Sequence, residues 1–434
     1  MAQKIIKPFK ENNWFAGGYQ HIWHPYTQMQ TAPLPMQVIG TDNVYIKLAN
    51  GQKLIDGISS WWSACHGYNH PYIIEAMKQQ LDIMPHIMFA GLAHEPAYNL
   101  ASKLVEITPD KLNRVFFADS GSVAIEVAMK MSVQYFKNIG ENNKSKFIAF
   151  KNGYHGDTMG AMSLCDRNNG MHKNLQQYSP GQYLIDIPND EYSFAEFVEL
   201  VKSISNNVAG MIIEPLVQGA GGMKFYSADI LSAIRKVAKD NNILFIADEI
   251  ATGFGRTSEM FACEEAGIRP DIMCLGKALT GGTCSLAAVM ATDEIFNGFL
   301  SDEMTKAFTH GPTYMANPLA CIAANASIDL FQTEPRLAQI QKIEQQMINQ
   351  LLVFNEHPKV IDVRVKGAIG VIELDCEWED IWFFRENFVK EDVWLRPFNN
   401  IIYLMPPFII SEEQLSYLIE KIAKIIKKWD MQKK

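Results

Sequence analysis

The sequence predicts an α/β protein in which a large domain with a mostly parallel sheet joins a smaller α+β domain. Short apolar runs without polar alternation recur through the middle of the chain, as in strands buried on both faces. Helical patterns lie between several of these runs, which is the alternation of a parallel sheet. After about residue 327 the pattern changes to a long polar helix followed by β-like runs. This change indicates the second domain.

The elements of the large domain follow in chain order. The expected strands are VFFA (115–118), KFIAF (146–150), GMIIEP (210–215), ILFIADE (243–249), IMCLG (272–276) and LAAVMA (286–291). Helices are expected at residues 122–136 and 227–240. Because such sheets bind ligands at the carboxyl ends of their strands, polar residues there are the candidates for a functional site.

The two ends of the chain predict the smaller domain. A helix over 335–353 precedes the β-like runs VIDVRV, AIGVIEL, VWLRPF and IIYLMPP. The last helix is expected to begin at Ser411, with Gln414 completing a capping box. Near the other end, VYIKLANGQKLID predicts a hairpin, so this segment is expected to join the small domain or contact a partner subunit. We therefore predict an N-terminal segment 1–59, a large domain 60–326 and a C-terminal domain 327–434.

Composition narrows the class of protein. The 434 residues are 48% hydrophobic and 20% charged, as in ordinary folded soluble proteins. A net charge of -9 argues against a nucleic-acid-binding surface. The chain has neither a signal-peptide pattern nor an apolar stretch near the roughly 18 residues of a membrane span, so no membrane partner is expected. Seven cysteines without a CxxC pair favour reduced thiols and a cytoplasmic location. The histidines do not cluster, so no metal is expected.

The stretch IMCLGKALTGG (272–282) places Lys277 between an apolar strand and a glycine-rich turn. Lysine is rarely buried, and desolvation there lowers its pKa and makes the amine nucleophilic. Such an amine can bind an aldehyde as a Schiff base. A lone lysine at this position more commonly reaches past the strand end to solvent. Its neighbours therefore decide between the two interpretations.

Two acidic residues, Asp248 and Glu249, end another apolar strand. A buried carboxylate needs a partner, because an isolated buried charge is costly. Pyridoxal 5'-phosphate would provide a partner for the lysine and for a carboxylate. Its aldehyde would bind Lys277, and its ring nitrogen would pair with the carboxylate. A helix cap or an ion pair is the commoner role for Asp248 when that residue is considered alone.

Two further strand ends match the remaining parts of that cofactor. Gly121 and Ser122 begin a helix after the strand VFFA, and a helix N-terminus binds phosphate well. The alternative is that Ser122 only caps the helix. After the strand KFIAF, a glycine-flanked loop carries Tyr154 and His155, and an aromatic ring there could cover a flat cofactor. Each signal is weak alone, but together they match one cofactor.

The segments IADEIATGFGR (246–256) and CLGKALTGG (274–282) resemble the signature of class III aminotransferases, which are pyridoxal-phosphate enzymes of fold type I. The resemblance covers nearly the whole chain. It implies that Lys277 forms the Schiff base and acts as catalytic base and acid, and that Asp248 pairs with the pyridine nitrogen. It also implies that Gly121 and Ser122 hold the phosphate and that Tyr154 stacks on the ring.

The same resemblance implies a homodimer whose site is shared between subunits. The segment FTHGPTYMANP (308–318) is similar to one that crosses the dimer interface in this family. In that case Pro312 and Thr313 would meet the partner's cofactor phosphate, and Gly311 would lie at the substrate.

Three segments narrow the substrate: HIWHPYTQM (21–29), DGISSWWSACHGYNHP (56–71) and VWLRPFNNIIYLMPP (393–407). They resemble the branch of the class that converts 8-amino-7-oxononanoate to 7,8-diaminononanoate with S-adenosyl-L-methionine, in biotin biosynthesis. An acceptor of this kind needs a cation for its carboxylate and apolar walls for its methylenes.

The sequence offers residues for both requirements. Arg396 is the candidate cation, since its guanidinium can bind a carboxylate in two places. Tyr26, Trp61 and Trp62 are candidates for the walls, and Tyr154 and Lys277 would also contact the substrate. Adjacent side chains of an extended strand point to opposite faces, so one tryptophan is expected to line the site, and the resemblance favours Trp61.

One departure from the class concerns the amino donor. The stretch EPLVQGAGG (214–222) carries Ala220 where glutamate-using members commonly carry a glutamate. The glutamate switch is therefore expected to be absent, which favours another donor, S-adenosylmethionine or lysine. Arg256 remains for polar groups of the substrate or for an ion pair. The alternatives are an aminotransferase for ω-amino acids or diamines, an isomerase of the same fold, or a non-catalytic pyridoxal-phosphate-binding regulator.

Overall fold

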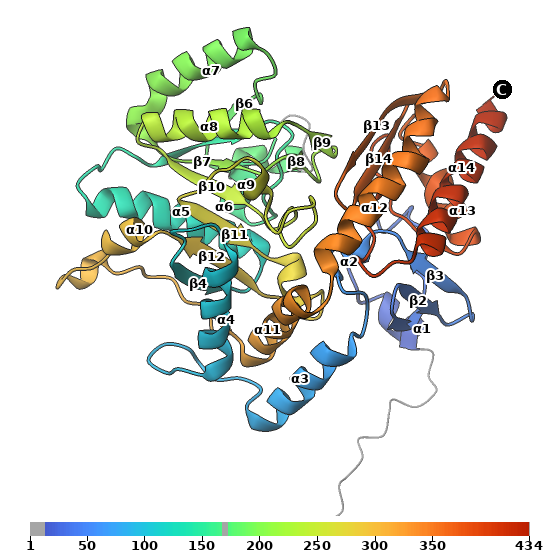
Figure 1. Ribbon diagram of the computed structural model, residues 1–434, viewed down its shortest axis with the longest axis horizontal. Helices are drawn as coiled ribbons and strands as arrows, with labels where there is room; N and C mark the ends of the chain where they lie inside the picture. Colours follow the sequence, from blue (N-terminus) through green and yellow to red (C-terminus); the bar gives the residue numbers. More distant parts are fainter. Residues whose placement is uncertain (1–13, 167–171, 434) are drawn as a thin grey trace, which may run out of the picture.

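The structure is a computed structural model that describes residues 14–166 and 172–433 (Figure 1). Its central sheet has the strand order β4 (Arg114–Ala118), β12 (Ala287–Ala291), β11 (Ile272–Leu275), β10 (Leu244–Asp248), β7 (Val208–Ile213), β5 (Lys146–Phe150) and β6 (Tyr183–Ile185). Only β12 runs antiparallel to its neighbours in this sheet. The predicted fold class, with its mostly parallel sheet, is confirmed. The short strand β6 was not predicted.

Both faces of this sheet are covered, which explains why its strands lack polar alternation. In β10, Phe245 and Ala247 pack into one apolar cluster, together with residues of α8 (Ala228–Asp240). Ile246 between them packs into another cluster, together with residues of α5 (Gly121–Asn138). Alternate side chains of a strand point to opposite faces, so each face needs apolar residues. The other long helices of this part of the chain are α4 (Glu95–Ile107), α7 (Glu191–Ile204), α11 (Pro318–Thr333) and α3 (Pro71–Ile83), which packs against α11.

The C-terminal part forms a second layer beside the large sheet (Figure 1). Its antiparallel sheet consists of β13 (Val360–Lys366), β14 (Ile369–Leu374) and β16 (Ile401–Leu404). Its helices are α12 (Arg336–Leu351), α13 (Asp380–Lys390) and α14 (Glu412–Lys433). The predicted capping box is confirmed, because the Ser411 amide donates to Gln414 Oε1 at 2.9 Å and the Gln414 amide donates to Ser411 Oγ at 3.2 Å.

The N-terminal segment joins this second layer. The predicted hairpin is confirmed as β2 (Tyr45–Leu48) and β3 (Lys53–Asp56), with β1 (Val38–Asp42) on its outer side. β15 (Val393–Trp394), the part of VWLRPF that forms a strand, pairs with β3 in parallel, so both chain ends build the smaller domain. The boundary predicted at 326/327 falls inside α11, and the domain limits stay a prediction.

Several short elements complete the fold. They are α1 (Trp14–Tyr19), α2 (Ser59–Trp62), α6 (Met159–Ser163), α9 (Ala262–Glu265), α10 (Asp293–Asn297), β8 (Val217–Gln218) and β9 (Lys224–Phe225). Among the helices of the described residues, none combines the length and the apolar character that crossing a membrane requires. All seven cysteines are free, and Cys65, Cys263 and Cys274 are fully buried.

Candidate functional site

The carboxyl ends of neighbouring strands bring Lys277 and Asp248 into one region. Asp248 ends β10 and is paired with Cys274 of β11, and Lys277 follows β11 directly. Lys277 begins a short 3₁₀ turn and has a positive φ of 45°. A non-glycine residue in this left-handed region is strained by about 1–2 kcal/mol, so the fold fixes the backbone of Lys277 against its own preference.

The amine of Lys277 lies against an aromatic ring. Its Nζ is 4.4 Å from the centroid of the Trp62 ring. Desolvation lowers the pKa of the amine, whereas the nearby carboxylates of Asp248 and Glu214 act to raise it, and the net shift is downward. A lowered pKa enlarges the neutral, nucleophilic fraction of the amine at a given pH.

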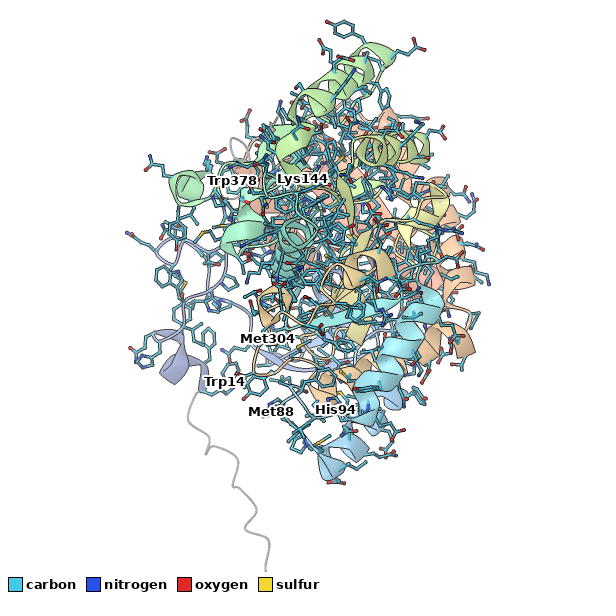
Figure 2. All side chains as sticks on the ribbon, turned by 90° about the vertical axis from the view of Figure 1, so that its left-hand side faces the viewer. Trp14, Met88, His94, Lys144, Met304 and Trp378 are labelled. Atoms are coloured by element: carbon cyan, nitrogen blue, oxygen red, sulfur yellow. The ribbon has the colours of Figure 1, made fainter. Side chains whose placement is uncertain are left out.

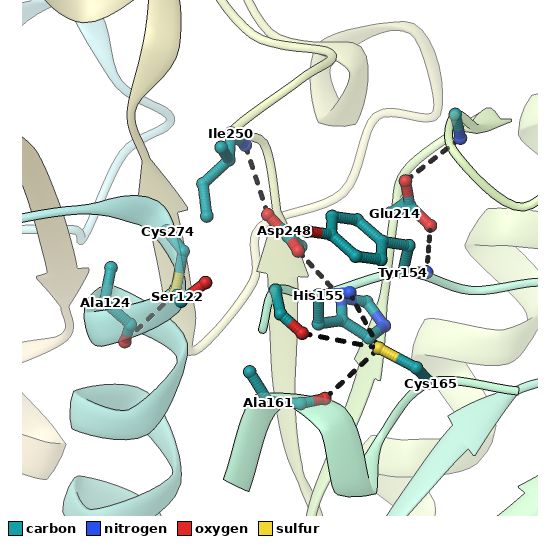
Figure 3. A network of polar contacts seen from close by, with 12 residues as sticks. Ser122, Ala124, Tyr154, His155, Ala161, Cys165, Glu214, Asp248, Ile250 and Cys274 are labelled. Carbon is teal, nitrogen blue, oxygen red and sulfur yellow. Dashed lines mark hydrogen bonds and ion pairs between the residues drawn. The ribbon is translucent and has the colours of Figure 1, made fainter. Parts of the chain in front are cut away.

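The carboxylate of Asp248 is held by a histidine. Asp248 is only 4% exposed, and its Oδ2 lies 2.7 Å from Nδ1 of His155 (Figure 3). The amide of Ile250 donates to Oδ1 at 3.2 Å. Burial lowers the pKa of His155. The bond to Asp248 and the negative charges of Asp248 and Glu214 raise it by more than burial lowers it, so the net shift is upward. The upward shift favours the protonated form of His155, which the side chain of Asp248 holds by this bond.

The adjacent residue Glu249 points elsewhere. Its Oε1 accepts the amide of Cys263 at 2.9 Å, and its other oxygen accepts the hydroxyl of Thr252. Burial raises the pKa of Glu249 to about 7. Of the two acidic residues at this strand end, only Asp248 lies with His155 and influences Lys277.

A third strand end contributes a carboxylate that the sequence analysis missed. Glu214 follows β7 and accepts the amide of Tyr154 at 2.9 Å and the amide of Gly219 at 3.0 Å (Figure 3). Burial raises its pKa to about 7. The available signal was the same as for Asp248, namely an acidic residue at the end of a fully apolar strand. Glu214 thereby fixes the loop that carries Tyr154.

Gly121 and Ser122 are the first two residues of α5, as predicted. The cap of this helix is Ser120, whose Oγ accepts the amide of Val123 at 3.4 Å, so the alternative that Ser122 is a capping serine is wrong. The Ser122 hydroxyl accepts the amide of Asp157 instead, at 3.0 Å. The first amides of a helix lack partners within the helix, so this end offers donors to an anion.

Gly156 lets the loop lie this close to the helix. It has a φ of +124°, and a Cβ there would lie 2.0 Å from Ser122 Oγ. Gly222 has nearly the same φ, +125°, but its nearest neighbour would be the end of Lys224 at 3.6 Å. We expect Gly156→Ala to lower Tm by about 2–4 °C more than Gly222→Ala, since only the first adds a clash to the shared backbone strain. Calorimetry measures both, and equal shifts would contradict the close approach.

Two tyrosines share one carboxylate in the same loop. The hydroxyl of Tyr26 donates to Asp157 Oδ2 at 2.6 Å, and that of Tyr154 donates to Oδ1 at 2.8 Å. The bond to His172 is the largest of the effects that lower the pKa of Asp157 to about 2. Burial, followed by the bond to Asp157, raises the pKa of Tyr26 to about 12. The sequence analysis named both tyrosines but missed Asp157, whose only signal was its place in the glycine-flanked loop.

The premise behind the expectation that only one of Trp61 and Trp62 lines the site is wrong, because the segment is not an extended strand, and which indole lines the site stays a prediction. Ser59, Ser60, Trp61 and Trp62 all have positive φ, from 49° to 74°, and form a left-handed turn. The Trp62 ring meets Lys277, while the Trp61 ring lies edge-on to the Tyr26 ring at 6.0 Å. Four strained residues in a row are costly, and such strain concentrates at functional sites.

The two candidate arginines have different surroundings. The Arg396 guanidinium lies 4.9 Å above the Trp61 ring, and burial lowers its pKa. Arg256 is 1% exposed and donates to the carbonyl oxygens of Ala368 and Pro406, at 3.2 and 2.9 Å. Arg256 forms no ion pair within the described residues, and its Nη1 ties the large domain to the smaller one. Its buried Nη2 has no hydrogen-bond partner there, so a role for Arg256 at polar groups of the substrate stays a prediction.

The residues predicted to reach a partner subunit stand apart. Gly311, Pro312 and Thr313 lie in a loop before α11, with Gly311 and Thr313 exposed. Within the described chain they make no polar contact with Lys277 or Asp248.

Ala220, at the position of the glutamate switch, is half-buried and carries no charge. At the neighbouring Gly219, a Cβ would lie 3.2 Å from the Trp62 ring. No group of three or more histidine, cysteine or acidic side chains among the described residues is placed to hold a metal.

The comparisons with known proteins cover nearly the whole chain. Residues 26–426 match the family model described as aminotransferase class-III. The adenosylmethionine-8-amino-7-oxononanoate aminotransferase of Buchnera aphidicola subsp. Schizaphis graminum is 46% identical, over 94% of this chain and 95% of that protein. The protein of the same name from Corynebacterium glutamicum is 41% identical, over 94% of this chain and 97% of its own length.

Solved structures of transaminases are similar to this chain over nearly its whole length. The crystal structure of the enzyme of that name from Methanocaldococcus jannaschii is 35% identical, with a TM-score of 0.90, and covers 95% of this chain and 98% of its own. An omega transaminase of Pseudomonas jessenii, in complex with PMP, is 26% identical with a TM-score of 0.89, over 95% of this chain and 97% of its own.

Proposed function

The chain belongs to the class III aminotransferases, which depend on pyridoxal 5'-phosphate, and we propose that it converts 8-amino-7-oxononanoate to 7,8-diaminononanoate with S-adenosyl-L-methionine as amino donor, a step of biotin biosynthesis. The relatives of that name support this substrate pair. One observation carries the proposal: two adjacent indoles connect the Lys277 amine with the Arg396 guanidinium. This arrangement suits a substrate with a reacting group at one end and a carboxylate at the other.

The residues of the site fit pyridoxal phosphate. Lys277 offers an amine of lowered pKa, and Asp248 a carboxylate fixed by His155. The amides that begin α5 at Gly121 and Ser122 offer donors for a phosphate. The loop around Gly156 approaches that helix end so closely that a side chain would not fit. We therefore propose that these residues, with Tyr154 beside the ring, hold the cofactor.

Bound in this site, pyridoxal phosphate supplies an aldehyde for amines and a ring that accepts electrons from the reacting carbon. Lys277 Nζ would hold the aldehyde of the cofactor at rest. As a free amine it would take the proton from the donor's α-carbon and give it back, acting as base and acid. Asp248 would hold the proton on the ring nitrogen. The same residues would act on the acceptor in the second half of a ping-pong reaction.

The acceptor's two ends are held by different residues. We place its carboxylate at Arg396 and its methylenes along Trp61 and Trp62. Tyr26 and Tyr154 present hydroxyl oxygens near the reacting end, both bonded to Asp157. Because the low pKa of Asp157 keeps it negative, this carboxylate can accept a hydrogen bond from the amino group that the acceptor already carries.

We propose a homodimer in which Gly311, Pro312 and Thr313 complete the partner's site. Tyr314, the residue after Thr313, is 60% exposed, and its ring lies 4.5 Å from that of His86, in the stretch that carries Met88. Met88 is 54% and Met304 81% exposed, and both lie in the lower half of the molecule in Figure 2. Such apolar exposure supports an interface. Sedimentation equilibrium is expected to give twice the 49.0 kDa of the chain, and a monomer would contradict the proposal.

The free state of all seven cysteines supports a cytoplasmic location, which cell fractionation would test.

The donor half-reaction tests the proposed function. The enzyme loaded with pyridoxal phosphate is mixed, in separate experiments, with S-adenosylmethionine, lysine, glutamate or β-alanine, and the visible absorbance is followed. S-adenosylmethionine is expected to bleach it, and subsequent 8-amino-7-oxononanoate to restore it with formation of 7,8-diaminononanoate. Bleaching by lysine alone would assign the donor to lysine. An ω-amino acid that bleaches the band, with no response to 8-amino-7-oxononanoate, would contradict the proposal.

A further inference from the structure

A second arginine lies beside the proposed carboxylate site. Arg385 is on α13, in the smaller domain (Figure 1). Its Nε and Nη2 both donate to the carbonyl oxygen of Pro397, at 3.0 and 2.8 Å. Pro397 directly follows Arg396, and a residue before proline has few backbone conformations available. The grip of Arg385 on this carbonyl therefore fixes the backbone from which the Arg396 side chain projects.

The two guanidiniums also influence each other electrostatically. Burial, and after it the positive charge of Arg396, lowers the pKa of Arg385 to about 10. Among the residues that the structure describes, no carboxylate forms an ion pair with either arginine. Two like charges in a half-buried place repel each other until an anion joins them. Guanidinium groups carry five N–H donors, so Arg385 keeps donors beyond the two that hold Pro397.

Aromatic rings connect this cation pair with the reactive lysine. The Arg385 guanidinium lies 5.2 Å from the Trp382 ring, and that of Arg396 lies 4.9 Å from the Trp61 ring. Tyr403 is 2% exposed, and its ring lies edge-on to the Trp62 ring at 6.2 Å. Burial raises the pKa of Tyr403, and the positive charges of Arg396 and Arg385 act to lower it. Since Trp62 contacts Lys277 and the adjacent Trp61 contacts Arg396, the two indoles lie between the reactive lysine and the Arg396 end of the pair.

We propose that Arg385 is a positioning residue that determines the specificity for a carboxylate-bearing acceptor, by holding the Arg396 loop and adding a second positive charge to its site. This inference rests on the proposed function. It extends the carboxylate site from a single guanidinium to a pair of them. Of this pair, Arg396 binds the substrate's carboxylate directly. Arg385 acts through Pro397 and through its charge.

The experiment compares 8-amino-7-oxononanoate with its methyl ester, which lacks the negative charge. In Arg385→Gln, KM for the acid is expected to rise about tenfold or more, while kcat and KM for the ester stay within about twofold. Arg385→Lys, which keeps the charge but not the two-donor grip, is expected to lie in between. The donor half-reaction is expected to keep its rate in both variants.

Lys428→Gln is the matched control. Lys428 lies on α14 and donates to Asn387 of α13 at 2.7 Å, so its loss removes one positive charge from the same corner of the domain without touching the Arg396 loop. Its KM for the acid is expected to stay at the wild-type value. An equal rise in Lys428→Gln and Arg385→Gln would overturn the inference.

The remaining outcomes separate the inference from the proposed function. An unchanged KM for the acid in Arg385→Gln, or an equal rise for acid and ester, would overturn the inference alone. Wild-type enzyme that does not convert the acid would overturn the proposed function and the inference with it. If thermal denaturation shows that Arg385→Gln is unfolded, the same acid-to-ester comparison in Arg385→Lys decides.

Discussion

Lys277→Ala is expected to lower turnover by about 10⁴-fold or more and to abolish the visible absorbance of the lysine-bound cofactor. Both effects have one cause, because the Lys277 amine is proposed as the group that binds the cofactor and as the group that moves the proton. The structure supports both roles, since the amine has a lowered pKa and the backbone is fixed at a strained φ of 45°. Steady-state rates and an absorbance spectrum of the variant with added pyridoxal phosphate measure the two effects.

Lys144→Met is a matched control for that experiment. Lys144 is another buried lysine, 6% exposed, whose pKa desolvation also lowers (Figure 2). Its Nζ donates to the carbonyl oxygens of Ser205, Val208 and Asn242, so it holds loops together. The variant is expected to lose stability but to keep the absorbance. Normal turnover in Lys277→Ala would exclude the proposed mechanism.

Asp248→Asn is expected to slow the donor half-reaction by about 10³-fold while leaving the absorbance of the lysine-bound cofactor in place. Asn preserves the size of the side chain but removes the negative charge that would keep the ring nitrogen protonated. It also leaves His155 without its carboxylate partner at 2.7 Å. Stopped-flow absorbance at saturating pyridoxal phosphate separates this loss of rate from weaker binding of the cofactor.

Glu249→Gln distinguishes this role from a general effect of burying a carboxylate. Glu249 is adjacent and fully buried, but it bonds Thr252 and the Cys263 amide instead of His155. Its half-reaction rate is expected to stay within about threefold of wild type. Equal losses in Asp248→Asn and Glu249→Gln would show that the strand end as a whole matters and would remove the special role of Asp248.

Much of the large domain could be predicted from local pattern. Strands buried on both faces have to be apolar throughout, and this made β5, β7, β10, β11 and β12 visible in the sequence. Their carboxyl ends share one edge of the sheet, so Lys277 and Asp248 could be expected together. The short edge strand β6 escaped prediction because three partly buried residues carry no periodic signal.

Side-chain partners could not be predicted in the same way. Arg256 looked like a residue for the substrate or an ion pair, yet it bonds the carbonyl oxygens of Ala368 and Pro406, more than a hundred residues away. Asp157 likewise gained its role from Tyr26, which lies 131 positions from it in the chain. Neither contact has a local signature, because it depends on how distant segments pack.

The sequence by itself determined the class of chemistry, because the residue types at the strand ends, above all Lys277 and Asp248, match what pyridoxal phosphate needs. The tertiary structure decided how those residues are oriented. It selected Asp248 over Glu249 by placing His155 beside one of them. It also placed the Trp62 ring at Lys277 and the Trp61 ring at Arg396, through a left-handed turn that the isolated segment would avoid. The physical reason is that such strain is stable only when packing from the rest of the fold compensates it.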